Sequence, residues 1–242
     1  MLRYIPDNEQ CNVSNECYYI HEGSNRRPVV APSNANKTNY KKSAGEKPIG
    51  GKVKRCFDFS LALLLLLFLS PFMVMIWAFV RLESKGPGLF KQARGGVHGK
   101  AFEIYKFRTM RQHDASFKQA VRGDERITRL GRFLRKTSID ELPQLLNVLK
   151  GEMSLVGPRP HVVAHDAEFM AFDSRYALRF QARPGVTGLA QVSGSRGPTD
   201  TEELKLKRIE LDLDYVEGWS HKKDFYVLIK TACLVLFDNK AF

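Results

Sequence analysis

The longest apolar stretch of the chain runs from Phe59 to Val80, 22 residues without a charge. About 20 such residues are enough for a helix to cross a bilayer. Ser70-Pro71 lies at the centre of the stretch, and a proline inside a helix removes a backbone hydrogen bond and kinks the helix. The pattern therefore leaves two structures open: one kinked transmembrane helix, or a re-entrant hairpin that enters and leaves the membrane by the same face.

Basic residues flank both ends of this stretch, with Lys52, Lys54 and Arg55 before it and Arg81 and Lys85 after it. Lys and Arg beside a membrane segment prefer its cytoplasmic side. A spanning helix would place one of the two groups on the opposite face, whereas a hairpin that turns at Ser70-Pro71 keeps both on one face.

Shorter patterns predict the elements that follow the apolar stretch. Four leucines between residues 142 and 149 recur at the spacing of one helix face, and Gly151 would end that helix. A second apolar segment, 224–237, is too short to span a membrane, so it is either core or a helix in the membrane interface. The other predicted elements are a strand over 102–110, a helix over 163–173, and a helix over 199–216 whose partial alternation leaves a strand open.

Residues 1–48 have a different composition, being rich in Asn and poor in aliphatic residues, with no sustained period. Such a segment is predicted to be a disordered polar tail. No apolar core of a secretory signal is visible in it. The four cysteines have no metal-like or redox-like spacing, which fits a cytosolic catalytic part without disulfides.

The net charge of +12 is concentrated in residues 91–136, where 13 Lys and Arg outweigh 4 Asp and Glu. A basic excess of 13 − 4 = 9 in one region predicts an anionic partner: nucleic acid, anionic lipid headgroups or the phosphates of a small substrate. Because the region follows a membrane segment, lipid and phosphate are favoured over nucleic acid.

The adjacent acids Asp140 and Glu141 are the first candidate for chemistry. They also fit a simple structural role, because Ser138-x-x-Glu141 matches a capping box and acids favour helix N-termini. Downstream, prolines on both sides of Arg159 would hold its guanidinium in a fixed direction, which suits phosphate recognition. Carboxylates in such basic surroundings can bind Mg²⁺ or act as a nucleophile. The residues therefore predict phosphoryl chemistry at a membrane surface.

A larger set of motifs resembles the bacterial sugar transferases, which are monotopic polyprenyl-phosphate phosphoglycosyl transferases. The resemblance covers roughly residues 49–242, in order. Its motifs are TSIDELPQLLNVLKGEMSLVGPRPH at 137–161, KRCFD at 54–58, the Ser-Pro break at 70–71, YKFRTM at 105–110, RITRLGRFLRKTS at 126–138, RPGVTGLAQVSG at 183–194, DLDYVEGWS at 212–220 and the final NKAF.

The resemblance implies an enzyme that moves a sugar 1-phosphate from a UDP-sugar to undecaprenyl phosphate and releases UMP, the first step of exopolysaccharide assembly. Asp140 would be the nucleophile that forms a phosphosugar–enzyme intermediate, and Glu141 would serve with Asp140 in a Mg²⁺ site. Four basic residues are expected to contact phosphates or the nucleotide, and one acid to bind substrate or metal; these are Lys106, Arg135, Arg159, Arg183 and Asp212.

The implied fold is α/β, dominated by helices with few short strands, with an N-terminal re-entrant membrane helix hairpin broken at Ser70-Pro71. Its parts would be a disordered tail over 1–48, the hairpin over 49–85, and a cytoplasmic catalytic domain with interfacial helices over 86–242. We expect a monotopic protein of the bacterial inner membrane, with its catalytic domain in the cytoplasm and no nucleic-acid partner. A homo-oligomer stays an open alternative.

Three points stay open at this stage. The motifs at 158–169 and 195–220 resemble the glucose branch of the family, so UDP-glucose is preferred, whereas 48–55 resembles the galactose type. His161 and His165 lie four residues apart, which suits metal ligands, but no third ligand is visible, and a role in shaping the sugar or nucleotide pocket, or in packing, is preferred. The alternatives to an enzyme are a membrane-anchored basic module that binds anionic lipid or nucleic acid, and an inactive scaffold.

Overall fold

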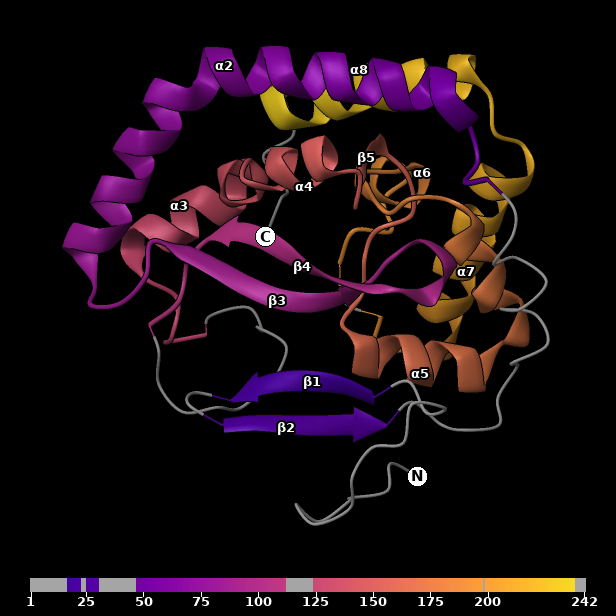
Figure 1. Ribbon diagram of the computed structural model, residues 1–242, viewed down its shortest axis with the longest axis horizontal. Coiled ribbons are helices and arrows are strands. Elements are labelled where there is room, and N and C mark those ends of the chain that lie inside the picture. The colour runs from indigo at the N-terminus through magenta and orange to yellow at the C-terminus, as the bar shows by residue number, and fades with distance from the viewer. Residues whose placement is uncertain (1–16, 23–24, 31–46, 112–123, 198, 238–242) are drawn as a thin grey trace.

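The computed structural model describes residues 17–22, 25–30, 47–111, 124–197 and 199–237, with only the backbone path given for 17–30. Figure 1 shows a long helix, α2 (Gly51–Glu83), that runs along one side of the molecule with α8 (His221–Phe237) beside it. The β3–β4 hairpin crosses the middle of the molecule, and α5 and α7 lie at one end of it. The helix-dominated fold with few short strands is confirmed.

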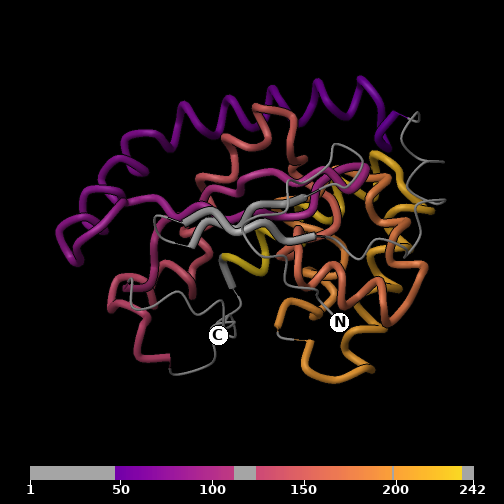
Figure 2. The backbone as a smooth tube through the Cα atoms, turned by 60° about the horizontal axis from the view of Figure 1, so that its bottom comes forward, coloured from indigo at the N-terminus to yellow at the C-terminus, as the bar shows by residue number. Residues whose placement is uncertain are grey.

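Helix α2 continues through Pro71, and in both Figure 1 and Figure 2 it bends before it reaches the hairpin. Pro71 has no N–H to donate to the carbonyl of Leu67, four residues earlier. The Ser70 hydroxyl donates to that same carbonyl at 2.9 Å. The predicted break is therefore a bend in one helix rather than an interruption, because Ser70 supplies the donor that Pro71 lacks.

Three two-stranded sheets complete the described fold. Strands β3 (Leu89–Gly95) and β4 (Ala101–Phe107) pair antiparallel, with Leu89 opposite Phe107. Strands β5 (Ser154–Val156) and β6 (Gly185–Thr187) pair parallel. A hairpin of β1 (Cys17–Glu22) and β2 (Asn25–Val30), which the sequence did not predict, lies inside the predicted tail. The rest of residues 1–46 lies outside the described part of the chain.

The remaining helices follow the predicted order with two corrections. Pro143 separates a short 3₁₀ turn from α4, so the leucine-patterned helix that Gly151 ends is shorter than predicted and begins at Gln144. The strand alternative for 199–216 is wrong: α7 is a helix, capped by Thr201. The helical elements are α3 (Arg129–Thr137), η2 (Ile139–Glu141), α4 (Gln144–Lys150), α5 (Val163–Phe172), η3 (Ser174–Gln181), α6 (Leu189–Val192) and α7 (Glu202–Glu217).

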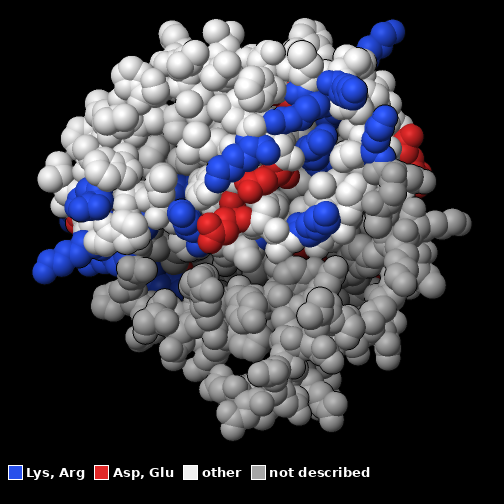
Figure 3. All heavy atoms as spheres, in the orientation of Figure 1, with Lys and Arg blue, Asp and Glu red and all other residues white. Residues whose placement is uncertain are grey.

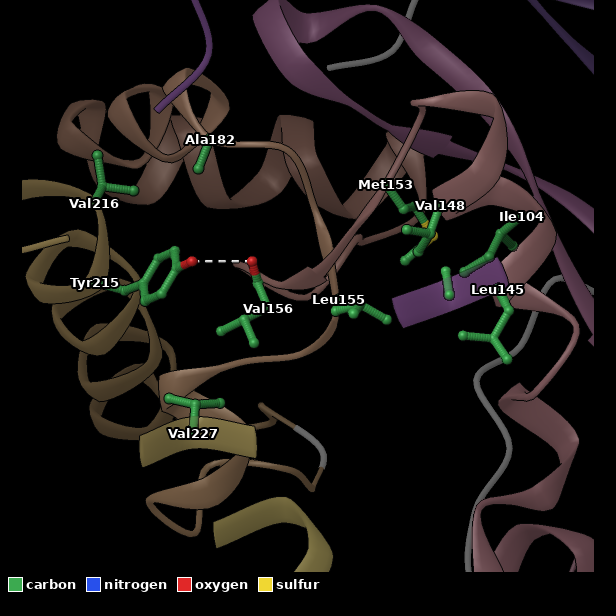
Figure 4. Packing of buried hydrophobic residues seen from close by; sticks show 11 residues of the cluster. Ile104, Leu145, Val148, Met153, Leu155, Val156, Ala182, Tyr215, Val216 and Val227 are labelled. Carbon is green, nitrogen blue, oxygen red and sulfur yellow. Dashed lines mark hydrogen bonds between the residues drawn. The ribbon is translucent and has the colours of Figure 1, made fainter. Parts of the chain in front are cut away.

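The main core lies between α2, α4, β5 and the last two helices (Figure 4). Met153 and Val148 are fully buried there, and the hydroxyl oxygen of buried Tyr215 on α7 lies 2.9 Å from the carbonyl oxygen of Val156. Since Val156 is the last residue of β5, this contact fixes the point at which the chain enters the Gly157-Pro158-Arg159-Pro160 loop.

Both ends of α2 are attached to the same domain. Near its start, Lys54 lies 2.6 Å from Asp224 on α8, and Arg55 donates to the carbonyls of Val148 and Leu149 at the end of α4. Near its end, Val80 packs in a cluster with residues of β4 and α3. A straight helix of 33 residues would be about 50 Å long, so the bend lets α2 wrap the domain rather than project from it.

Candidate active site

The short turn η2 carries Asp140 and Glu141, and both residues are largely buried. Before the turn, Ser138 ends α3 in the left-handed conformation, with φ 59°. The predicted capping box is wrong, because the Ser138 side chain does not cap the turn; its backbone carbonyl accepts from the N–H of Glu141 at 3.1 Å instead. Both acids are thus available for a role other than helix capping.

Glu141 is held by two cations from distant parts of the chain. Lys106 on β4 donates to Oε1 at 2.8 Å, and Arg159 donates to Oε1 at 2.7 Å and to Oε2 at 3.3 Å. Burial would raise the pKa of Glu141, but the charges of Arg159 and Lys106 hold that pKa well below its usual range. Glu141 is therefore a permanent anion whose oxygens already have partners.

The carboxylate of Asp140, in contrast, has no such partners. Asp140 is only 8% exposed, yet no residue in the described part of the chain donates a hydrogen bond to its carboxylate. Burial and the neighbouring charge of Glu141 raise the pKa of Asp140 to about 6, against the opposing effects of Lys106, Arg135 and Arg159. A carboxylate that is ionised at neutral pH and accepts no hydrogen bond is well suited to act as a nucleophile.

Arg135 completes the basic side of this pair. It is half-buried on α3, and its Nε donates to Thr109 Oγ1 at 2.8 Å, which fixes the guanidinium plane. Burial lowers the pKa of Arg135, and the charge of Asp140 opposes that effect. Three of the predicted basic residues, Lys106, Arg135 and Arg159, thus surround the two acids and give the group a formal charge of 3 − 2 = +1.

Asp212 does not lie beside the two acids. It is 3% exposed on α7, and its carboxylate pairs with Arg179, whose Nη2 lies 3.0 Å from Oδ2. The same nitrogen donates to the backbone carbonyl of Arg159. The structure therefore makes Asp212 a support for the loop that carries Arg159, and the predicted direct contact with substrate or metal finds no support in its position.

Arg183 is also remote from the pair. Its Nε donates to the carbonyl of Gly151 at 3.1 Å, at the far end of α4, where Arg55 also lies. Helix α4 has seven residues, so about 10 Å of helix separates this end from the Asp140–Glu141 end. In this structure Arg183 caps α4 and does not join the basic group around the acids.

The support behind Arg159 is a buried polar cluster that the sequence did not predict as a unit. Tyr176 lies at its centre: its hydroxyl donates to Asp166 at 2.5 Å, accepts from Arg179 at 2.8 Å, and lies 2.7 Å from His161 Nδ1. Burial and the charges of nearby arginines hold the pKa of His161 well below its usual range. A search for spacing could not find this cluster, since its members come from α5, η3 and the loop before α5.

Two sets of residues bear on metal binding: the predicted His161 and the pair Asp140–Glu141. Among the residues that the structure describes, no three His, Cys, Asp or Glu side chains lie close enough together to hold an ion. His161 is buried against Phe169, with ring centroids 4.9 Å apart, so the packing role preferred for it is supported. Asp140 with Glu141 still fits Mg²⁺, which is commonly held by one or two carboxylates, waters and substrate phosphates.

Known proteins with similar sequences point to one family. The family model described as "Bacterial sugar transferase" matches residues 49–238. A UDP-glucose:undecaprenyl-phosphate glucose-1-phosphate transferase of Caulobacter vibrioides is 50% identical over 191 residues, which cover 78% of this chain and 72% of the relative. The transferase of that name in Escherichia coli is 46% identical over 191 residues, covering 78% and 41%.

A relative with a different sugar in its name is also similar. The undecaprenyl-phosphate galactose phosphotransferase of Salmonella typhimurium is 41% identical over 209 residues, which cover 78% of this chain and 42% of the relative. The matched part of this chain thus spans less than half the length of the Escherichia coli and Salmonella typhimurium proteins.

Proposed function

This chain belongs to the bacterial sugar transferase family, as its motifs predicted, and we propose that it moves a sugar 1-phosphate from a UDP-sugar to undecaprenyl phosphate with release of UMP. One observation carries the proposal: Asp140 is ionisable and receives no hydrogen bond from any residue that the structure describes, while Glu141 beside it is paired with Lys106 and Arg159. The first acid is left for chemistry, and the second holds two cations in place for phosphate oxygens.

The proposed reaction has two steps on one nucleophile. A carboxylate oxygen of Asp140 attacks the phosphorus bonded to the sugar, the bond from that phosphorus to the bridging oxygen breaks, and UMP leaves with the bond's electron pair. An oxygen of the lipid phosphate then attacks the same phosphorus, and the Asp140 carboxylate leaves. Such a double displacement lets one site serve a soluble donor and a lipid acceptor in turn.

The basic residues would act mainly through charge and position. Phosphoryl transfer needs little covalent assistance from the protein beyond orientation and stabilisation of charge on the phosphate oxygens. The guanidinium of Arg135 is fixed by its contact to Thr109, and Arg179 holds the backbone carbonyl of Arg159, so both arginines stand on supported positions toward a phosphate. Mg²⁺ held by Asp140 and Glu141 would neutralise the diphosphate; treatment with EDTA is then expected to abolish UMP release, and added Mg²⁺ to restore it.

The nucleophile is tested by Asp140→Asn, which keeps the shape and removes the charge. We expect no UMP release and no labelled protein after incubation with a sugar-labelled UDP-sugar. Asp214→Asn, on an exposed acid of α7, is the matched control and is expected to keep full activity. Unchanged turnover in the Asp140 variant would show that the nucleophile lies elsewhere.

Glucose is the proposed sugar. Glucose stands in the names of the relatives at 50% and 46% identity, and galactose in that of the relative at 41%. A panel of UDP-glucose, UDP-galactose and UDP-N-acetylglucosamine in the UMP-release assay tests this choice. Release that is faster with UDP-galactose than with UDP-glucose would reverse the assignment.

We place the chain in the inner membrane as a re-entrant, monotopic protein with its catalytic domain in the cytoplasm. Helix α2 is the one described helix long and apolar enough to cross a bilayer, and little of its apolar stretch is buried. Attachment of both of its ends to one domain favours the hairpin over a span, because a span would separate those ends by about 30 Å of hydrocarbon.

The surface distribution of charge supports the same placement. In Figure 3 the upper part of the face, which α2 and α8 form, is almost free of charged side chains, and Lys and Arg gather below it. On α8, Phe225 is 63% exposed and Ile229 49%, so this helix suits the membrane interface. A protease-cleavable tag before residue 49 is expected to be cut only after the cytoplasmic side is opened. Cleavage from the periplasm would favour a spanning α2.

The membrane-anchored basic module is the weaker alternative. Its basic residues would need to be free for lipid or nucleic acid, whereas Lys106 and Arg159 are engaged with Glu141. The family itself is defined by sugar transfer, which favours the enzyme.

A further inference from the structure

A loop between α6 and α7 brings one more arginine to the active site. Arg196, in the segment 193–197, extends to the turn before Asp140, where its Nη2 donates to the hydroxyl of Ser138. The two residues are 58 positions apart in the chain, and no pattern in the sequence connected them. Ser138 lies two residues before Asp140, so Arg196 is a neighbour of the proposed nucleophile.

The loop is held in this position by a buried charge. Arg208 on α7 is 6% exposed, and its Nη2 donates to the carbonyls of Ser195 and Gly197, at 2.5 and 2.7 Å. These carbonyls lie immediately before and after Arg196. Burial of a guanidinium is costly unless its partners are well placed. Here much of its hydrogen bonding is directed to the backbone that presents Arg196, which suggests that the position of Arg196 matters.

Arg196 itself differs from the other basic residues of the site. Lys106 and Arg159 are ion-paired with Glu141, whereas Arg196 pairs with no carboxylate among the residues described and donates one hydrogen bond to a neutral hydroxyl. Its side chain is half-buried. A guanidinium has five N–H donors and binds phosphate in a bidentate manner more strongly than it binds a hydroxyl. Arg196 is therefore a cation at the site with donors to spare.

We propose that Arg196 is a phosphate-binding residue of this active site, which exchanges Ser138 for a phosphate group of a substrate. The proposal rests on the proposed function, since that function brings phosphates to Asp140. The phosphate could belong to the nucleotide sugar or to the lipid, and the chemistry of recognition is the same.

The test measures binding rather than turnover, in protein that also carries Asp140→Asn. Two probes are titrated separately, UDP-glucose and a short-chain polyprenyl phosphate in detergent. Adding Arg196→Ala is expected to weaken binding of one of them at least tenfold, and Arg196→Lys to restore part of that loss. The probe that is affected identifies the source of the phosphate. Because the assay needs no catalysis, it remains informative even if the wild-type chain releases no UMP.

A matched variant separates binding from support of the backbone. Ser138→Gly removes the hydroxyl and suits the left-handed backbone at φ 59°, so it breaks the contact without straining the turn. We expect it to bind both probes as well as its parent. Arg175→Ala, on an exposed arginine paired with Asp173, controls for the loss of one positive charge. Equal losses for Ser138→Gly and Arg196→Ala, or less than a twofold loss for Arg196→Ala with both probes, would overturn the proposal.

Discussion

Two of the pairs of buried acids in this domain differ in how their carboxylates are paired. Asp58 on α2 and Asp224 on α8 share Lys54, and their remaining oxygens accept from neutral donors. Asp58 accepts from the Ser154 hydroxyl at 2.7 Å and the Leu155 N–H at 3.2 Å. Asp224 accepts from the side chains of two further residues, Tyr215 at 2.7 Å and Trp219 at 3.2 Å.

The pair Asp140–Glu141 differs from this pair both in how its oxygens are paired and in the formal charge of its surroundings. Glu141 is saturated by two cations, but Asp140 accepts nothing from any residue that the structure describes. The formal charge is 1 − 2 = −1 for the Lys54 cluster and +1 for the Asp140 cluster. Buried polar groups in proteins are normally satisfied. Burial alone therefore does not distinguish these two pairs; Asp140 differs from Asp58 and Asp224 because its carboxylate has no hydrogen-bond donor among the described residues.

The largest expected effect is on stability, when Lys54 is removed from its cluster with Asp58 and Asp224. Lys54→Met leaves Asp58 and Asp224 as two buried carboxylates without a cation, which should lower the free energy of unfolding by about 4 kcal/mol. Thermal unfolding in detergent measures the change. Lys52→Met, on an exposed lysine of the same helical turn, should change stability little.

An equal stability of the Lys54 and Lys52 variants would mean that the neutral donors alone hold the two acids. The Lys54 cluster could then no longer be described as one that depends on its cation for stability. Activity serves as a second readout, since the Lys54 variant should still release UMP at temperatures where it is folded.

The next effect concerns pH. Asp140 must be ionised to attack, and its pKa is raised to about 6 by burial and by Glu141. The initial rate of UMP release should therefore be flat above pH 7 and fall below pH 6, by about tenfold per pH unit. The measurement is made without lipid, because the second pKa of a phosphomonoester also lies near 6.

Lys106→Met sharpens this prediction. The charge of Lys106 lowers the pKa of Asp140, so its removal should move the inflection to higher pH. A rate that stays constant from pH 5 to 8 in the wild-type protein would contradict the role of Asp140 as a free carboxylate.

The two clusters also show what sequence could predict. Local signals were sufficient for the strand near 102–110 and the helix at 163–173, because each depends on neighbours in the chain. Turn geometry was harder to predict from sequence. The capping box was wrong because Ser138 adopts a left-handed backbone conformation, which the pattern Ser-x-x-Glu does not indicate.

Contacts between distant segments were predicted only in part, since Lys106 and Arg159 do lie at Glu141. The resemblance placed Arg183 and Asp212 with the substrate, but the fold puts Arg183 at the far end of α4 and Asp212 behind Arg159. Arg179 carries the support from Asp212 to Arg159, and nothing in its local sequence indicated that role. Long-range pairing is set by packing of α7 against η3, which depends on the whole core.

The smallest effect is a change in stability with opposite signs in the two clusters. The folded-state pKa of Asp140, about 6, lies above the ordinary Asp value of 3.8, so ionised Asp140 costs stability; the cost is absent below about pH 4 and complete above about pH 6. At pH 7.5, Asp140→Asn should therefore raise the free energy of unfolding, by roughly 1 to 3 kcal/mol, and the gain should vanish at pH 4. Asp224→Asn should lower it, because Lys54 loses its 2.6 Å partner. Thermal unfolding of both variants at the two pH values measures the signs, and a loss of stability in Asp140→Asn at pH 7.5 would mean that Asp140 is a satisfied structural acid like Asp224.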